Sequence, residues 1–215
     1  MSAGHSAAAQ AAALRAGARR GLWRRICAWI GLGTAVRRAD AQAARWAHGA
    51  AGEATTGLLL VQLEAHGWHV RHDLALPRSR ANLDHVLISP CGTTVVVLDT
   101  KAWRRSWPTH LVHGRVHCGD QDRHEQVEKV AAYARKVAAA VNIPAPAVRP
   151  LLVVHGSPVT GGYLEASTPD GPVLVLSPAY LVPTLAGAPA ACDPWRAGGL
   201  ADRVDAVLRP YMQGR

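Results

Sequence analysis

Charged side chains stand at the ends of two runs of residues that have the composition of buried β-strands. Val86 to Ile88 and Val95 to Leu98 are β-branched or aliphatic throughout, as in strands covered on both faces. Asp84 precedes the first run, while Asp99 and Lys101 follow the second. Because side chains alternate along a strand, Asp99 and Lys101 share one face, and in an antiparallel hairpin Asp84 falls near Asp99. The sequence predicts two carboxylates and an ammonium at one end of a small sheet, groups that can bind a cation or stabilise charge.

A purely solvated role competes with this chemical one, because acids at strand ends commonly face water. An isolated Asp-x-Lys triplet is also too short to be specific. The flanking residues make the pattern more specific. Gly52 and Glu53 open a helix upstream, a Pro-Cys-Gly turn at residues 90–92 joins the two strands, Trp103 follows Lys101 by two residues, and Gln126 opens a later helix.

With these flanks, the chain resembles the nuclease-related domain (NERD) family, a branch of the PD-(D/E)-x-K nuclease superfamily, over about residues 50–142. The resemblance implies an α/β fold with a restriction-endonuclease-like core in the order α-β-β-β-α-β, to which we expect the chain to add an N-terminal basic helical arm and extra C-terminal helices. It also implies a Mg²⁺-dependent nuclease, more specifically a DNA endonuclease that hydrolyses phosphodiester bonds, with Mn²⁺ as an alternative metal. The family's catalytic positions fall on Glu53, Asp84, Asp99, Lys101 and Gln126.

The resemblance also implies a role for each of these residues. Asp84 and Asp99 hold the metal, and Glu53 completes its ligands directly or through water; such oxygen donors suit Mg²⁺. Lys101 polarises the attacking water and stabilises the transition state, and Gln126 orients that water or a phosphate. The family more often has Glu at the position of Asp99, and the shorter side chain of Asp draws the carboxylate inward.

The elements that must position these residues follow from hydrophobic periodicity. We expect a helix over residues 41–66, broken at Gly49 to Gly52, so that Glu53 stands in the first turn of its second part. An edge strand over 68–74 and a loop over 75–82 follow it. Downstream we expect a hairpin over 111–116, a helix that starts after a capping box at 122–125, a strand over 149–154, a loop over 155–171, a strand over 173–176, a helix over 178–185 and a last helix around residues 200–208.

The net charge of +9 lies mainly at the N-terminus of the 215-residue chain. Residues 1–50 contain eight Arg and one Asp, which leaves the remainder nearly neutral. We therefore expect a basic, helical and partly disordered arm over residues 1–49 and one NERD-like domain over 50–215. A basic arm favours a nucleic acid partner, DNA rather than RNA. The expected phosphate contacts are Arg15, Arg19, Arg20, Arg24 and Arg25 in the arm, and Arg78 and Arg80 in the loop over 75–82.

Residues 21–36 form a basic amphipathic segment, with Trp23, Ile26, Trp29 and Ile30 at helical spacing. Such a helix can dock on the domain, contact phosphates or lie on an anionic membrane surface. Two alternatives to a nuclease follow: a catalytically weak nucleic-acid-binding domain, and a protein held at a membrane surface by this segment. Three clustered acids would repel phosphate, which favours the nuclease over a domain that only binds.

The four cysteines are far apart and form no C-x-x-C pair, so neither a zinc ribbon nor a disulfide framework is indicated. A reduced, cytoplasmic location is the expectation. The uncharged stretch over 26–36 is shorter than the roughly 20 apolar residues that span a bilayer. His110, His113, His117 and Cys118 invite a zinc site, but Gly114 breaks any helix that would align them. The sequence leaves the oligomeric state open.

Overall fold

The computed structural model describes residues 34–188 and 191–211, with side chains from residue 49 onward. The arginines of the expected basic arm, Arg15 to Arg25, lie outside the described residues, as does most of the amphipathic segment over 21–36. The structure therefore bears on the expected domain and not on the arm.

Among the described residues, seven strands form a central sheet. They are β1 (His69–Ala75), β2 (Asn82–Ile88), β3 (Val95–Ala102), β7 (Val148–His155), β8 (Tyr163–Ala166), β9 (Val173–Leu176) and β10 (Arg209–Pro210). Their order across the sheet is β10-β1-β2-β3-β7-β9-β8. β1, β2 and β3 pair antiparallel, whereas β3, β7 and β9 pair parallel. The two strands that carry Asp84 and Asp99 are therefore neighbours at the middle of the sheet.

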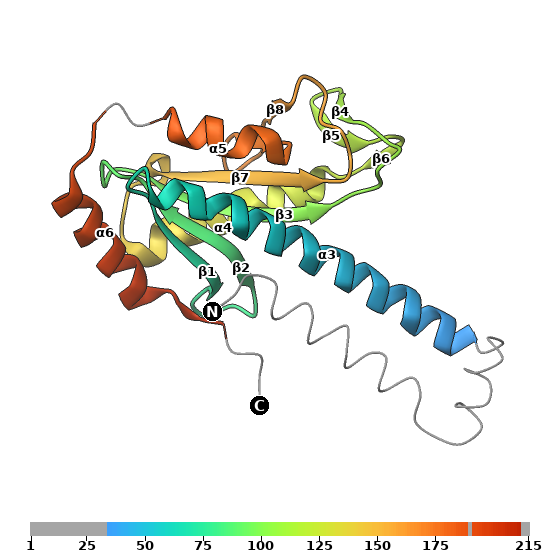
Figure 1. The fold of residues 1–215 in the computed structure, drawn as a ribbon, viewed down its shortest axis with the longest axis horizontal. Helices are drawn as coiled ribbons and strands as arrows, with labels where there is room; N and C mark the ends of the chain where they lie inside the picture. The colour runs from blue at the N-terminus through green and yellow to red at the C-terminus, as the bar shows by residue number, and fades with distance from the viewer. Residues whose placement is uncertain (1–33, 189–190, 212–215) are drawn as a thin grey trace, which may run out of the picture.

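Helices cover both faces of this sheet (Figure 1). α3 (Thr34–Glu64) and α5 (Pro178–Ala186) lie on one face, where Leu60 and Leu181 belong to the same core cluster as Leu98. α4 (His124–Val141) and α6 (Pro194–Val207) lie on the other face, where Val137 and Val204 join a second core cluster. Both faces of β2 and β3 are thus buried, as their nearly continuous apolar composition predicts.

α3 is continuous, so the predicted break at Gly49 to Gly52 is wrong. Gly52 is buried, and a Cβ at this position would lie 3.4 Å from Cγ2 of Thr100 on β3. The glycine lets the helix approach the sheet closely and does not end the helix. Glu53 is consequently in the interior of α3, where the stabilisation expected for an acid in a first helical turn does not apply.

The turn between β2 and β3 requires its glycine for two reasons. Gly92 has a φ of +64°, and a Cβ at this position would lie 2.4 Å from the backbone carbon of Arg196 in α6. The amide of Asp193 also donates to the carbonyl of Pro90 at 2.8 Å. The Pro-Cys-Gly turn is therefore packed directly against the start of α6.

A second, three-stranded sheet is formed by the part of the chain between β3 and α4. It consists of β4 (Thr109–Val112), β5 (Arg115–Cys118) and β6 (Gln121–Asp122). The predicted hairpin turn is present, with positive φ at His113 and Gly114. No group of three or more His, Cys, Asp or Glu side chains in the described part of the chain is placed to hold a metal ion, so the histidines of this sheet do not form the zinc site that their sequence invites.

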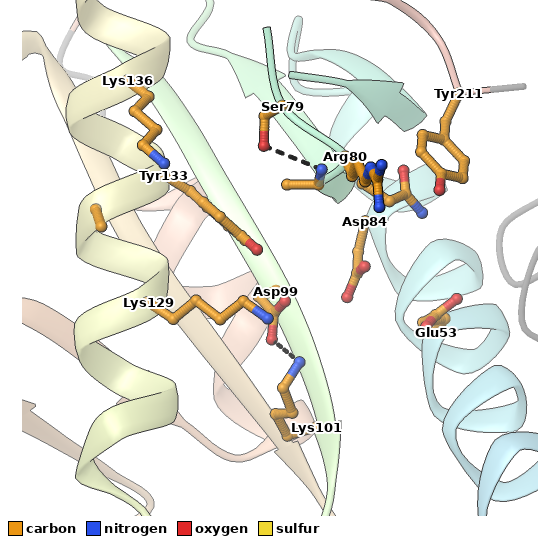
Figure 2. Close-up of a pocket in the computed structure, with 13 residues that line it drawn as sticks. Glu53, Ser79, Arg80, Asp84, Asp99, Lys101, Lys129, Tyr133, Lys136 and Tyr211 are labelled. Atoms are coloured by element: carbon orange, nitrogen blue, oxygen red, sulfur yellow. Dashed lines mark hydrogen bonds and ion pairs between the residues drawn. The ribbon is translucent and has the colours of Figure 1, made fainter. Parts of the chain in front are cut away.

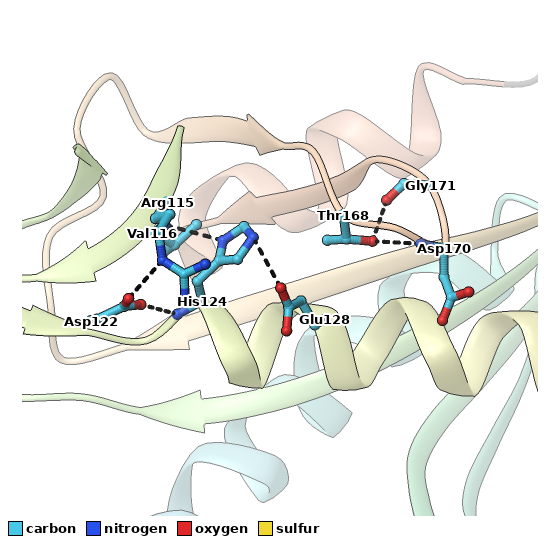
Figure 3. A network of polar contacts seen from close by, with 8 residues as sticks. All are labelled: Arg115, Val116, Asp122, His124, Glu128, Thr168, Asp170 and Gly171. Atoms are coloured by element: carbon cyan, nitrogen blue, oxygen red, sulfur yellow. Dashed lines mark hydrogen bonds and ion pairs between the residues drawn. The ribbon is translucent and has the colours of Figure 1, made fainter. Parts of the chain in front are cut away.

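Asp122 ties the small sheet to the start of α4 (Figure 3). Its carboxylate accepts hydrogen bonds from Nε of Arg115 at 2.7 Å and from the amide of His124 at 2.8 Å. The amide of Val116 donates to Nδ1 of His124, and Nε2 of the same ring faces Glu128 at 3.7 Å. Asp122 therefore lies at the start of α4 as predicted. Its carboxylate accepts from the amide of the first helical residue, His124, and the four residues do not form a capping box.

Two further predictions need correction. β1 is not an edge strand, because β10 pairs with it on its outer side. The stretch over 155–171, predicted as a loop, contains β8, which pairs antiparallel with β9. Both of these additional strands are short and only partly apolar, so periodicity does not reveal them. The remaining helices and strands lie within a few residues of their predicted positions.

Candidate active site

Asp84, Asp99, Lys101 and Glu53 line one open cavity of about 690 Å³. The cavity lies between α3 and α4 at one end of β2 and β3 (Figure 2). Lys129, Tyr133 and Lys136 of α4 form one wall, and the loop before β2 and Tyr211 form another. The complete lining consists of Glu53, Ser79, Arg80, Ala81, Asn82, Asp84, Asp99, Lys101, Lys129, Ala132, Tyr133, Lys136 and Tyr211.

The pairing of β2 with β3 brings the two aspartates together. His85 is opposite Leu98 in the antiparallel register, so Asp84 and Asp99 follow at the same end of the pair. One oxygen of Asp84 accepts a hydrogen bond from the amide of Thr100 at 2.9 Å, which holds this carboxylate against β3. Burial, followed by the charge of Asp99, raises the pKa of Asp84 well above its ordinary value.

Lys101 lies two residues beyond Asp99 and pairs with it directly. Its ammonium donates to Oδ2 of Asp99, and both side chains are partly buried, with 32% and 14% of their surfaces exposed. Burial alone would lower the pKa of Lys101, but the carboxylates of Asp99 and Asp84 outweigh it and raise the pKa. The lysine is therefore a cation, held where a negatively charged ligand would meet it.

Glu53 of α3 also lines this cavity, although α3 and α4 cover opposite faces of the sheet. Burial raises its pKa from 4.5 to about 7, and the charges of Asp73 and Asp99 add to the increase, while Lys101 opposes it. Glu53 and Asp84 thus both hold their protons more tightly than an ordinary carboxyl. The three carboxylates share the cavity with the ammonium of Lys101, and Arg80, Lys129 and Lys136 add further cations to its lining.

Gln126 does not line this cavity. Its side-chain oxygen accepts a hydrogen bond from the indole Nε1 of Trp103 at 3.1 Å, and the side chain is half-buried. Trp103 follows Lys101 on the same strand end, so this bond joins α4 to the end of β3. In this arrangement Gln126 supports the strand that carries Asp99 and Lys101 and does not contact the carboxylates of the cavity itself.

The two loop arginines differ in position. Arg80 lines the cavity, whereas Arg78 is exposed outside it and has a φ of +56°. The loop over 75–82 therefore brings one guanidinium to the site.

Sequence reasoning missed the residues that α4 contributes. Lys129, Tyr133 and Lys136 follow one another at intervals of four and three residues, so they share one face of the helix. The chain contains 21 arginines and only three lysines, and all three lysines, Lys101 included, line this one cavity. The scarcity of lysine is visible in the sequence, but only the fold shows that the three converge.

The chain matches a known protein family over the segment that builds this cavity. The family model described as "Nuclease-related domain" matches residues 48–155, half of the sequence, and this range contains every lining residue of the cavity except Tyr211. No curated protein and no solved structure matches the chain. Within residues 34–188 and 191–211, every helix is too short or too polar to span a lipid bilayer.

Proposed function

Because this chain belongs to the nuclease-related domain family, we propose that it is a Mg²⁺-dependent nuclease that hydrolyses phosphodiester bonds of DNA, as an endonuclease. The observation that carries this proposal is the joint placement of three carboxylates and all three lysines of the chain around one cavity. A polyanionic substrate needs cations to approach a site that contains three carboxylates, and the lysines supply them.

The carboxylates that would hold the metal are Glu53, Asp84 and Asp99. Their donor atoms are the hard oxygens that Mg²⁺ or Mn²⁺ prefers. Burial first, and then the charges of neighbouring carboxylates, raise the pKa of Glu53 and of Asp84, and a bound cation would oppose both increases. As the side chains stand, no three His, Cys, Asp or Glu residues in the described part of the chain are placed to hold a metal ion, so these three carboxylates would have to move closer together to bind one. Once bound, a divalent metal would neutralise the phosphoryl oxygens and provide a nucleophilic water at neutral pH.

Lys101 is the residue we assign to transition-state stabilisation. Its Nζ carries a proton at neutral pH because the neighbouring carboxylates raise its pKa. When a phosphate enters the cavity, the ammonium can turn from Oδ2 of Asp99 toward a phosphoryl oxygen, which also frees the carboxylate as a ligand. Gln126 would act as a positioning residue through Trp103.

The fold is consistent with the restriction-endonuclease-like core that the family implies. The order α3, β1, β2, β3, α4, β7 follows the expected α-β-β-β-α-β pattern, with the small sheet inserted before α4. We further propose that residues 1–49 act as a basic arm that contacts phosphates through Arg15 to Arg25, and that residues 50–215 form the nuclease domain, acting in the cytoplasm.

A cleavage assay tests this proposal with the purified chain on supercoiled, linear, branched and single-stranded DNA, with and without Mg²⁺. Lys101→Ala should abolish cleavage and keep metal binding, because the ammonium is not a ligand. Asp99→Asn should lose both. Arg135→Ala is a matched control, because it removes one positive charge from an exposed site on α4 outside the cavity.

Equal trace cleavage by wild type and Lys101→Ala would contradict the proposal and identify the activity as contamination. DNA binding without any metal-dependent cleavage would favour a domain that only binds nucleic acid.

A further inference from the structure

The wall formed by α4 has the composition of a surface that binds a nucleic acid strand. Lys129 and Lys136 are exposed and are separated by about 10 Å along the helix, at 1.5 Å per residue. Tyr133 lies between them, with Nζ of Lys129 5.6 Å from the centre of its ring. All three side chains extend from α4 into the cavity (Figure 2). The wall thus presents an aromatic ring between two cations.

The opposite wall has a similar composition. Arg80 is exposed on the loop before β2, and Tyr211 follows β10, where its amide donates to the carbonyl of Asp73 at 2.7 Å. This bond holds the start of the C-terminal segment against β1. Each wall of the cavity therefore offers a cation and an aromatic ring, and the carboxylates of Asp84 and Asp99 lie between the two walls.

The geometry points to a single unpaired strand of nucleic acid as the substrate that enters this cavity. In this arrangement, which rests on the proposed nuclease function, Lys129 and Lys136 bind successive backbone phosphates and Tyr133 stacks on a base. The strand is thereby held with a phosphodiester bond over Asp84 and Asp99. Duplex substrates are cleaved only where a strand can separate, such as an end, a flap or a branch.

Two physical reasons favour a single strand over an intact duplex. First, a base can lie flat on a tyrosine ring only when that face is not covered by neighbouring base pairs, so stacking selects unpaired bases. Second, a cavity of about 690 Å³ has the size of a small-molecule site. This volume is comparable to part of one strand, which favours a single strand between α4 and the loop before β2.

Binding to short DNA oligonucleotides tests the inference, with the full chain and with EDTA present so that no cleavage occurs. Tyr133→Leu keeps an apolar side chain for packing but removes the aromatic ring. We expect it to weaken single-strand affinity by about 5- to 150-fold, the range measured when an aromatic stacking partner is removed. Affinity for a blunt duplex hairpin should change by less than about twofold. Tyr133→Phe should bind as the wild type does, and Tyr163→Leu, at an exposed tyrosine on β8, is the matched control.

The lysines are tested by the dependence of binding on salt concentration. Lys129→Ala combined with Lys136→Ala should reduce the log-log slope for single strands by about 1.4, at about 0.7 for each phosphate that is no longer neutralised. Arg135→Ala should leave the slope unchanged. Equal losses of affinity for single strand and duplex, an equal loss in Tyr133→Phe, or an unchanged slope in the double variant would each overturn the inference.

These experiments distinguish a failure of the strand-binding inference from a failure of the nuclease proposal. Binding of single strands that depends on Tyr133, without metal-dependent cleavage, would refute the nuclease and keep the strand-binding surface. Cleavage that prefers intact duplex and is unaffected by Tyr133→Leu would refute the strand inference and keep the nuclease.

Discussion

Replacing Glu53 by glutamine should stabilise the protein at alkaline pH. The pKa of this carboxyl is raised from 4.5 to about 7, first by burial and then by Asp73 and Asp99. The folded chain therefore holds the proton of Glu53 to a higher pH than the unfolded chain does. The associated stability is present below about pH 4.5 and is lost as the pH rises through about 7.

The size of the effect follows from the shift. One pKa unit corresponds to about 1.4 kcal/mol, so ionisation of Glu53 costs the folded state at most about 3 kcal/mol at pH 8 relative to low pH. Water reaches part of the side chain and screens its charge, which lowers the expected cost to between about 1 and 3 kcal/mol. Glutamine has no charge to bury or to repel Asp73 and Asp99, so Glu53→Gln should not lose this stability.

Urea denaturation at pH 5 and pH 8, with EDTA present, measures the difference. The free energy of unfolding of Glu53→Gln should be close to that of the wild type at pH 5 and exceed it by about 1 to 3 kcal/mol at pH 8. Glu165→Gln, at an exposed glutamate on β8, should change neither value. A Glu53→Gln variant that is no more stable than wild type at pH 8 would refute the conclusion that the folded chain raises the pKa of Glu53.

Mg²⁺ extends the same experiment. A cation that binds the native carboxylates stabilises the folded state by mass action, so Mg²⁺ should raise the Tm of the wild type more than that of Glu53→Gln. An identical rise in both proteins would show that Glu53 is not a ligand.

Three further predictions concern other parts of the chain. Gly92→Ala should lower the free energy of unfolding by about 1 to 3 kcal/mol or more, because an alanine is strained at a φ of +64° and its Cβ meets α6. Denaturation curves measure this change. Gly198→Ala, where a Cβ meets nothing within 4 Å, is the control. Burial, with the charge of His72, lowers the pKa of His85 to about 3, so stability is lost as the pH falls from about 6.5 toward 3. The free energy of unfolding of the wild type relative to that of His85→Leu should therefore fall by about 2 kcal/mol between pH 8 and pH 5. A difference that stays constant over this pH range would contradict the prediction. Removing residues 1–33 should weaken DNA binding at low salt and reduce the log-log salt slope by about 0.9 for each phosphate that the arm neutralises. An unchanged slope, or a loss of affinity for anionic vesicles alone, would exclude a DNA role for the arm.

The strand pair that carries the candidate site could be predicted from local rules. The alternation of side chains places Asp99 and Lys101 on one face, and a hairpin with a Pro-Cys-Gly turn places Asp84 beside them. These conclusions need only the period of a strand and the length of a turn. The position of α4 could be predicted for the same reason, since a period of 3.6 residues is a local property. The apolar stripe that follows this period consists of Val127, Val130, Ala131, Ala134, Val137, Ala138 and Val141.

Contacts between distant elements could not be predicted in this way. The sequence suggests that Gly52 interrupts a helix, but its neighbour on β3 shows that it permits close packing. Gln126 is expected to reach the acids, but the indole of Trp103 takes its side-chain oxygen. In both cases a residue about 20 or more positions away decides what the local pattern leaves open.

The sequence by itself determined the family, the strand pair β2 and β3 and the acid-x-lysine end of β3, because each depends on residue types at short, regular spacing. Only the tertiary structure decided which charges share the cavity. Lys129 and Lys136 are separated from Lys101 by 28 and 35 positions, and nothing in their spacing relates them to it. They meet because β3 and β7 pair in parallel and α4, which connects them, crosses one face of the sheet. That crossover, fixed by the burial of the apolar stripe of α4, turns the polar side of the helix and its two lysines toward the carboxylates.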